Sequence, residues 1–303
     1  MRLIVHGQQA FGQSVLESLL SRGDDVVAVY CAPDRGERQD PLKVFALEHN
    51  LPVYQPPSYK DPAVSVEMAA LNADLCVMAY VTLLVPEEVL NTPRLGSIQY
   101  HPSLLPMHKG PSSINWPIIF GESKTGLSIF WPDKGLDTGP ILLQQEVDIG
   151  PDDTLGSLYF DHLFPMGVEG LVEGVGRVAD GSAEKVPQDP NAGTYEGWCR
   201  KADVEIDWAQ PVDVVYNLIR GANPQPGAWT TCAGHEVGIY DCRKVDGDGI
   251  AGQVLQVDGD SITVAASAGG IRIDRVRTAE LGKVTAGAYA AQSGIAVGTL
   301  LGG

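Results

Sequence analysis

Residues 2–30 read RLIVHGQQAFGQSVLESLLSRGDDVVAVY, and this stretch decides the fold class. Residues 3–5 are a short apolar run that predicts a buried strand, which ends at Gly7. Residues 11–20 carry apolar side chains at helical spacing, and residues 26–30 form a second continuous apolar run. Strands that are apolar on both faces and joined by helices are typical of a mostly parallel sheet with helices on both sides. We therefore predict an α/β fold with a doubly wound, Rossmann-like sheet.

The same alternation continues along the first 180 residues. The further predicted strands are 51–54, 75–81, 97–100, 125–131 and 141–147, and the predicted helices are 41–50, 64–71, 86–90, 113–120 and 155–178. A stretch rich in Pro, Gly, Asp and Asn follows, which is typical of a linker. Beyond it, one helix and several short β-rich runs separated by Asp-Gly turns predict a small antiparallel, OB-like β-barrel. The β-rich runs are 228–232, 236–240, 252–257, 261–265 and 270–276, and the helix is 212–220. The predicted organisation is a catalytic domain 1–180, a linker 181–207 and a barrel domain 208–303.

Composition excludes several classes of function. The formal net charge is −17, which disfavours a broad nucleic-acid or anionic-membrane surface because such surfaces need clustered Lys and Arg. The five cysteines are scattered singly, so neither a structural zinc site nor a disulfide framework is expected. The N-terminus lacks a signal-peptide pattern, and no window approaches the roughly 18 apolar residues of a spanning helix. We expect a cytoplasmic protein with free thiols and no metal.

The first glycine loop, residues 7–12, lies between the first strand and the first helix and reads GQQAFG. A dinucleotide-binding fingerprint needs a middle glycine that lets the backbone approach a pyrophosphate, and Gln9 stands at that position. We therefore expect no nicotinamide cofactor. Two interpretations stay open: a tight turn, or a helix N-terminus at which Gly7, Gln8 and Gln9 hold an anionic group of a substrate.

Two further segments concentrate polar residues in loops. Residues 101–110, HPSLLPMHKG, follow a strand and so lie at the carboxyl edge of the sheet, where open α/β proteins bind ligands. Residues 135–139, GLDTG, lie in a turn between two predicted strands. Taken alone, His101 is best interpreted as a structural or solvated histidine, and Asp137 as an aspartate that caps backbone amides.

Together the two segments resemble the folate-dependent formyltransferase family. This family includes glycinamide-ribonucleotide, methionyl-tRNA and amino-sugar formyltransferases. The similarity is strongest to the N-terminal hydrolase domain of 10-formyltetrahydrofolate dehydrogenases. The resemblance spans nearly the whole chain and weakens after about residue 235. The matching stretches are GQ at 12–13, YHPSLLP at 100–106, SINW at 113–116, SIFW at 128–131, GLDTG at 135–139, TYEG at 194–197 and PGAW at 226–229.

The resemblance implies a reaction and three catalytic residues. The formyl donor would be 10-formyltetrahydrofolate, with no metal and no NAD. His101 would stabilise the negative charge that develops on the formyl oxygen. Asp137 would orient His101 and help to take the proton from the nucleophile. Family members usually place an asparagine two residues before the histidine, whereas the hydrolase domain carries an apolar residue there. Gln99 departs from both patterns, but it keeps the amide and so favours transferase over hydrolase chemistry.

The resemblance also implies the residues that contact ligands. Each of the contacts named below also has a purely structural interpretation, as a strand end, a polar turn or a solvated lysine. The folate pocket would be lined by Tyr80, Val81, Thr82, Leu83 and Leu84 on one side and by Lys134, Gly135 and Leu136 on the other. The acceptor or loop contacts would be Gly7, Gln8, Gln9, Ser103, Leu104, Lys109, Gly110 and Asn115.

The charge narrows the choice of formyl acceptor. A tRNA acceptor needs basic surface for its phosphates, and residues 181–303 contain 10 basic against 15 acidic residues. We expect a small-molecule amine, such as an amino sugar or an amino-acid derivative. The alternative is water, which makes the chain a hydrolase that releases formate and tetrahydrofolate. A non-catalytic folate-binding protein is disfavoured because it would not need both His101 and Asp137. A chain of 303 residues leaves no room for an aldehyde-dehydrogenase domain, so no NADP-dependent oxidation is expected, and the oligomeric state is not predicted.

Overall fold

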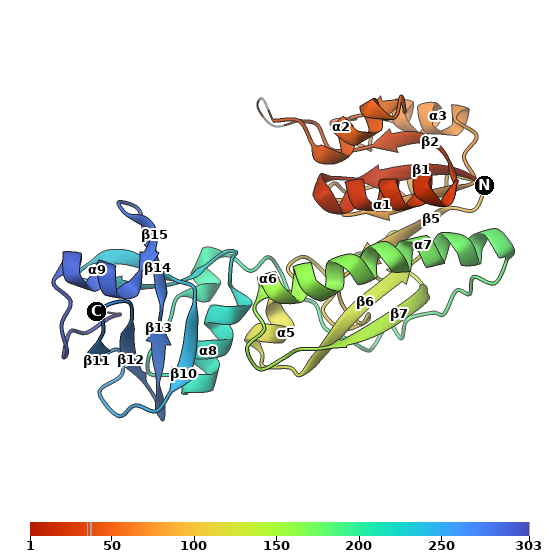
Figure 1. Cartoon of the computed structure of the whole chain (residues 1–303). Helices are drawn as coiled ribbons and strands as arrows, with labels where there is room; N and C mark the ends of the chain where they lie inside the picture. Colours follow the sequence, from red (N-terminus) through yellow and green to blue (C-terminus); the bar gives the residue numbers. More distant parts are fainter. Residues whose placement is uncertain (35, 37, 303) are drawn as a thin grey trace. The chain divides into compact units, whose positions relative to one another are not determined.

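The chain forms two compact units in a computed structural model that describes residues 1–34, 36 and 38–302 (Figure 1). Each unit is assembled from more than one stretch of the chain, so neighbours in space are often distant in sequence. The first unit comprises Met1–Gly110, Gly126–Glu146 and Asp161–Tyr195, and the second comprises Pro111–Thr125, Val147–Phe160 and the chain from Glu196 onward.

The first unit is built on a seven-stranded sheet with the strand order β3-β2-β1-β4-β5-β6-β7. The strands β1 to β5 pair in parallel and β6 is antiparallel to β5, which confirms the predicted fold class. The strand order reverses direction between β1 and β4, and such a point opens a crevice at the carboxyl ends of the strands. The bounds are β1 Arg2–Gly7, β2 Asp25–Tyr30, β3 Val53–Tyr54, β4 Leu75–Ala79, β5 Ser97–His101, β6 Lys124–Phe130 and β7 Ile141–Asp148.

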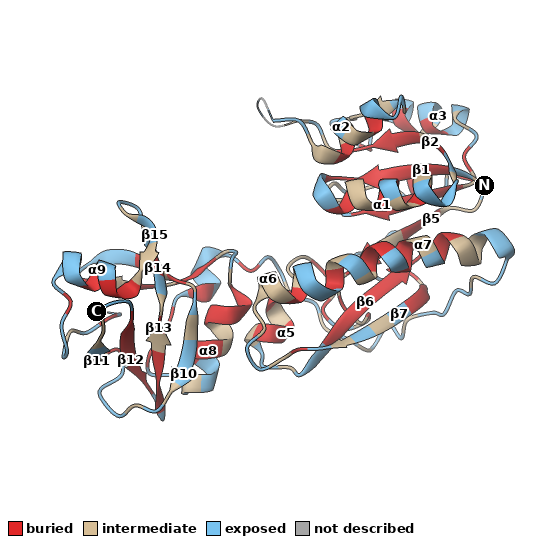
Figure 2. Cartoon of the chain, viewed as in Figure 1, coloured by how far each residue is buried: buried red, intermediate tan, exposed pale blue. Residues whose placement is uncertain are grey.

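Helices bury both faces of this sheet. The helices α1, α2 and α7 contribute to one apolar core, and α3 and α4 contribute to the other. Figure 2 shows the strands largely buried and the outward faces of the helices exposed. At Gly167 a Cβ atom would lie 2.5 Å from a ring carbon of Tyr100, so a glycine lets α7 approach the sheet. The bounds are α1 Gln9–Arg22, α2 Pro41–Glu48, α3 Pro62–Ala70, α4 Glu87–Leu90 and α7 Phe164–Asp180.

The long helix predicted for residues 155–178 is not continuous. The structure has a short helix α6, Leu155–Ser157, then a π-helical turn at Leu158–Leu163, and only then α7. Pro165 lies in the first turn of α7, where a proline lacks the amide hydrogen that would extend the preceding hydrogen-bond pattern. Residues 155–178 are therefore helical as predicted, but the long regular α-helix begins only at Phe164, next to Pro165.

The second unit contains two four-stranded antiparallel sheets, with orders β10-β13-β12-β11 and β15-β14-β9-β8. The predicted run 270–276 is divided: β13 and β14 lie in different sheets, with Asp274 between them. Three elements were not predicted, namely β10, β15 and α9. The bounds are α5 Asn115–Ile119, α8 Val212–Gly221, β8 Ala228–Cys232, β9 His235–Ile239, β10 Cys242–Val245, β11 Val254–Val257, β12 Ile262–Ala266, β13 Gly269–Ile273, β14 Arg275–Thr278, β15 Gly282–Thr285 and α9 Ala286–Ser293.

All five cysteines have free thiols, and burial raises the pKa of Cys31 and Cys76 to about 12. In the part of the chain that the structure describes, no helix has the length and apolar character to cross a membrane.

Candidate active site

His101 is the last residue of β5 and is only 6% exposed. Its Nε2 atom lies 2.9 Å from the carbonyl oxygen of His108, and its Nδ1 atom lies 3.6 Å from Oδ2 of Asp137. A carbonyl oxygen only accepts hydrogen bonds, so this contact assigns a hydrogen to Nε2. The other nitrogen faces a carboxylate.

Asp137 is buried in a turn whose backbone is held from two sides. Its φ of +55° lies in the left-handed region, which residues other than glycine seldom adopt. Its Oδ2 atom accepts a hydrogen bond of 2.8 Å from the backbone N–H of Gly110. The side-chain amide of Gln188 donates to the carbonyl oxygens of Asp137 and Gly139, at 2.9 and 2.7 Å. These contacts fix the direction in which the carboxylate points.

Gln99 lies two residues before His101 and presents an unused amide. It pairs through its backbone with Met78 on β4 and with Phe130 on β6. Its side chain is half-buried, and no hydrogen bond found among the described residues involves its carboxamide. The side chain lines a cavity of about 240 Å³. The amide is therefore available to a bound molecule.

This cavity brings together most of the predicted folate-binding residues. Val81, Thr82, Leu83, Leu84, Gly135 and Leu136 line it, whereas Tyr80 and Lys134 are not among its lining residues. Leu84 and Leu136 are 71% and 52% exposed, so two large apolar side chains stand uncovered on it. A cavity with apolar walls and few polar groups suits a flat ring with polar edges. The remaining lining residues are Met78, Val85, Leu90, Gln99, Phe130, Pro132, Asp133 and Asp137.

The predicted acceptor residues lie in three different settings. Gln8 donates from its side chain to Oγ1 of Thr82, across the ends of β1 and β4. The backbone N–H of Gln9 contacts both carboxylate oxygens of Asp40 at 2.9 Å. A carboxylate of the chain itself thus lies at the N-terminus of α1. In the second unit, the buried amide of Asn115 donates to the carbonyl oxygens of Gly221 and Gln225 and so secures the end of α8.

The loop from His101 to Gly110 is held by hydrogen bonds within itself and by others to Ser128, Asp137 and Thr194. Ser103 is fully buried, and its hydroxyl donates to the carbonyl oxygen of Met107 at 2.6 Å. Leu104 packs against β6, where a Cβ atom on Gly126 would lie 2.6 Å from it. The backbone N–H of Lys109 donates to the carbonyl oxygen of Thr194. Ser103, Leu104 and the Lys109 backbone therefore shape the loop.

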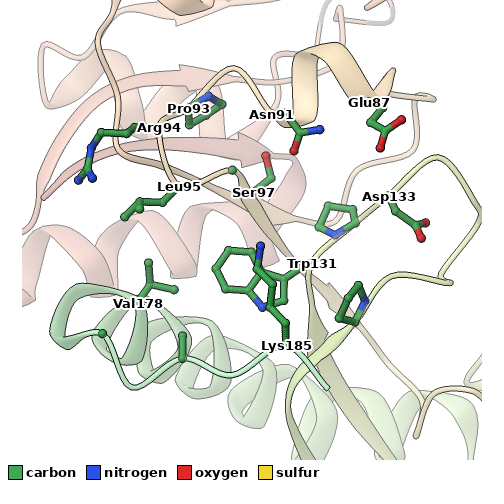
Figure 3. Close-up of a pocket in the computed structure, with 15 residues that line it drawn as sticks. Glu87, Asn91, Pro93, Arg94, Leu95, Ser97, Trp131, Asp133, Val178 and Lys185 are labelled. Atoms are coloured by element: carbon green, nitrogen blue, oxygen red, sulfur yellow. The ribbon is translucent and has the colours of Figure 1, made fainter. Parts of the chain in front are cut away.

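A larger cavity, of about 660 Å³, lies beside the beginning of β5 (Figure 3). Its walls include Trp131, with the Lys185 ammonium 4.3 Å from the ring centroid, as well as Glu87 and Arg94. None of the three predicted catalytic residues lines it. The smaller cavity, which Gln99 and Asp137 line, is therefore the candidate active site. Among the described residues, no group of three His, Cys, Asp or Glu side chains could hold a metal ion.

Comparison of this chain with known protein families shows the family to which it belongs. The family Formyl transferase matches residues 1–173, and its C-terminal domain matches residues 199–294. The chain belongs to the formyl transferase family. This result confirms the resemblance seen in the sequence and, with it, the prediction of an enzyme that handles formyl groups.

Several family members are similar in sequence over most of this chain. Cytosolic 10-formyltetrahydrofolate dehydrogenase of Mus musculus is 42% identical over 265 residues, which is 86% of this chain and 29% of that protein. The chain therefore spans less than a third of the dehydrogenases it matches. Methionyl-tRNA formyltransferase of Geobacter metallireducens is 36% identical over 283 residues, with 91% of each chain covered.

Solved structures share the fold at low sequence identity. HypX from Aquifex aeolicus, in complex with tetrahydrofolic acid, superposes with a TM-score of 0.71 at 18% identity, over 96% of this chain and 47% of HypX. The sugar 3N-formyl transferase WlaRD superposes with a TM-score of 0.70 at 17% identity, over 90% of this chain and 97% of that enzyme.

Sequence reasoning missed three residues that contact predicted site residues. Gln188 and Thr194 lie in the stretch that its composition marked as a linker, and Asp40 lies in a loop before α2. The TYEG match contained Thr194, which is the one signal that pointed to any of them. Gln188 and Asp40 carried no signal, because a polar residue in an irregular segment has no periodicity.

Proposed function

We propose that the chain transfers the formyl group of 10-formyltetrahydrofolate to a small-molecule amine, with His101, Asp137 and Gln99 as its catalytic residues. The observation that carries the proposal is the unused Gln99 amide beside the His101–Asp137 pair, at a cavity lined by the predicted folate loops.

We expect this cavity to hold the donor's pterin ring. Leu84 and Leu136 offer apolar surface for the ring faces, and the backbone of residues 81–84 offers amides and carbonyls for the ring edge. Two similar structures support this assignment, since HypX was solved with tetrahydrofolic acid and WlaRD with 5-N-formyl-THF.

The side chains at the site match the demands of formyl transfer. Attack on a formyl carbon places negative charge on the formyl oxygen, and preorganised donors at that position lower the barrier. His101 supplies an N–H donor once a bound formyl oxygen takes the place of one of its acceptors in the chain, and Gln99 supplies a second N–H donor. Asp137 orients His101 and accepts the proton that the amine loses, directly or through water. The bond between the formyl carbon and N10 of the folate then breaks, and the proton passes to N10 as tetrahydrofolate leaves.

The surroundings of α1 bear on the acceptor. Asp40 lies against the backbone N–H of Gln9, so a negative charge already stands where an anionic acceptor group would bind. We therefore favour an acceptor that does not anchor a phosphate at this turn. The net charge of −17 further disfavours tRNA, although a methionyl-tRNA formyltransferase is among the relatives.

Water is the second candidate acceptor. The observation that favours it is the 42% identity with a 10-formyltetrahydrofolate dehydrogenase, whose N-terminal hydrolase domain the sequence resembles. The observation that favours an amine is Gln99, which keeps the amide side chain of the transferases.

One assay separates the two. The protein is incubated with 10-formyltetrahydrofolate, without and then with a panel of amines, and tetrahydrofolate release is followed. Release that depends on one class of amine supports the proposed transferase, and equal release without any amine supports the hydrolase. If no tetrahydrofolate is released under either condition, both assignments are wrong.

A further inference from the structure

We infer that Gln188 and Thr194 are positioning residues that hold the His101–Asp137 pair in its working geometry. Both lie on residues 186–195, which follow α7 in the first unit and are called the strap here. The inference rests on the proposed function, because it assigns a role within the same site. Neither residue lines the 240 Å³ cavity: Gln188 acts through Asp137, which lines it, and Thr194 acts through the loop that follows His101.

Gln188 secures the turn that carries Asp137. Its amide nitrogen donates to the carbonyl oxygens of Asp137 and Gly139, so one side chain fixes two peptide groups of the turn. The turn needs this support because Asp137 has a left-handed backbone conformation, which is unfavourable for a residue with a Cβ atom. The Oε1 atom of Gln188 is buried without a hydrogen-bond partner among the described residues. A buried polar atom without a partner costs stability, so the side chain is explained by its donor bonds to the turn rather than by a gain in stability.

Thr194 secures the loop that follows His101. Its hydroxyl oxygen accepts from the backbone N–H of His108 at 2.9 Å. Its backbone carbonyl accepts from Lys109, and its backbone N–H donates to Pro106. The strap lies tightly against the loop here, because a Cβ atom on Gly193 would come within 2.0 Å of the Pro106 carbonyl oxygen.

These contacts reach both members of the catalytic pair through consecutive peptide groups. The peptide group that joins His108 to Lys109 donates through its N–H to Thr194 and accepts through its oxygen from His101. The next N–H along the chain, that of Gly110, donates to the Asp137 carboxylate. A rotation of the first peptide group would therefore turn away the acceptor of His101 and shift the donor of Asp137 together.

The expected effect is on turnover rather than on donor binding. Displacing a catalytic group by about 1 Å costs on the order of 100-fold in rate, whereas the cavity walls stay unchanged. Thr194→Val keeps the side-chain volume and removes the acceptor for His108, and Thr194→Ser restores the hydroxyl. Gln188→Leu removes both donor bonds to the turn.

The test compares these variants with Asn191→Ala, an exposed side chain on the same strap. We expect kcat to fall about 10- to 100-fold in Thr194→Val and Gln188→Leu, with the KM for 10-formyltetrahydrofolate within about twofold. Thr194→Ser should recover most of kcat, and Asn191→Ala should match the wild type. An unchanged kcat in both altered variants, a matching rise in KM, or an equal loss in Thr194→Ser would overturn the inference.

A second readout does not depend on activity. The ¹⁵N NMR signals of the His101 ring, assigned by their loss in His101→Gln, report the hydrogen bonds of both ring nitrogens. We expect these signals to shift in Thr194→Val and to stay in place in Asn191→Ala. Unshifted signals in a folded Thr194→Val variant would contradict the positioning role. If the wild type releases no tetrahydrofolate but the His101 signals shift as expected, the proposed function fails and the inference stands.

Discussion

Two buried histidines near the carboxyl ends of parallel strands have opposite surroundings. His6 on β1 is 3% exposed, and its ring lies against Tyr59, with centroids 4.7 Å apart. Burial lowers the pKa of His6 from its ordinary 6.5 to about 3, so the ring is neutral at any physiological pH. His101 on β5 is almost as buried, but it faces a carbonyl oxygen and the Asp137 carboxylate.

The difference lies in the groups that face each ring rather than in the burial of the ring. Desolvation penalises the charged form of His6, which packs against an aromatic ring, whereas His101 has an acceptor near each ring nitrogen. The local sequence does not separate the two cases, since LIVHG and IQYHP both place a histidine after a strand. The partners of His101 come from the turn at residue 137 and from the loop at residue 108. Long-range folding therefore decides which histidine can take part in a reaction.

The largest expected effect is the loss of His101. We expect His101→Ala to lower the rate of tetrahydrofolate release about 1000-fold, because a donor to the formyl oxygen is removed. Single-turnover kinetics measure this rate, and fluorescence titration checks that the donor still binds. A rate within tenfold of the wild type would remove His101 from the mechanism.

Asp137→Asn is the next largest expected effect. Asparagine tolerates the left-handed backbone and can still accept from Gly110, so the turn is preserved. The variant loses the negative charge that faces His101 and accepts a proton, and we expect kcat to fall about 100-fold. The kcat and KM for 10-formyltetrahydrofolate measure it. Wild-type turnover in this variant would show that the charge is dispensable.

Gln99→Leu has a smaller expected effect. The flexible side chain of glutamine must be ordered before its amide can donate, so its contribution is less than that of a rigid donor. We expect about tenfold lower kcat for Gln99→Leu and a smaller change for Gln99→Asn. Parallel steady-state assays of the two variants check this order. Equal losses in both would mean that chain length, rather than the amide, matters here.

His6→Leu should leave turnover unchanged and alter only the dependence of stability on pH. The folded state holds His6 neutral, whereas the unfolded chain binds a proton below pH 6.5, so stability falls as pH falls from 6.5 toward 3. The slope is about 1.4 kcal/mol per pH unit, or about 2 kcal/mol between pH 6.5 and pH 5. Urea unfolding at these two pH values measures the free energy of unfolding. The same pH dependence in wild type and His6→Leu would show that another group is responsible.

Much of the fold follows from the sequence because buried strands and helices leave periodic patterns. The apolar runs of β1, β2 and β4 are unambiguous, whereas β10 and β15 carry exposed charged residues and lack such a run. Within the candidate site, His101, Asp137 and Gln99 were predicted from motifs that resemble those of a known family. Gln188 and Asp40 act through hydrogen bonds to distant backbone groups, and such contacts depend on the path of the whole chain.

The most direct test of the central claim follows the formyl carbon itself. 10-Formyltetrahydrofolate labelled with ¹³C in the formyl group is incubated with the amine panel and with wild type, His101→Ala or His6→Leu. The account predicts a labelled N-formyl product for wild type and for His6→Leu at equal rates, and almost none for His101→Ala. Label that remains on the donor with wild-type protein, or equal product from His101→Ala, would contradict it.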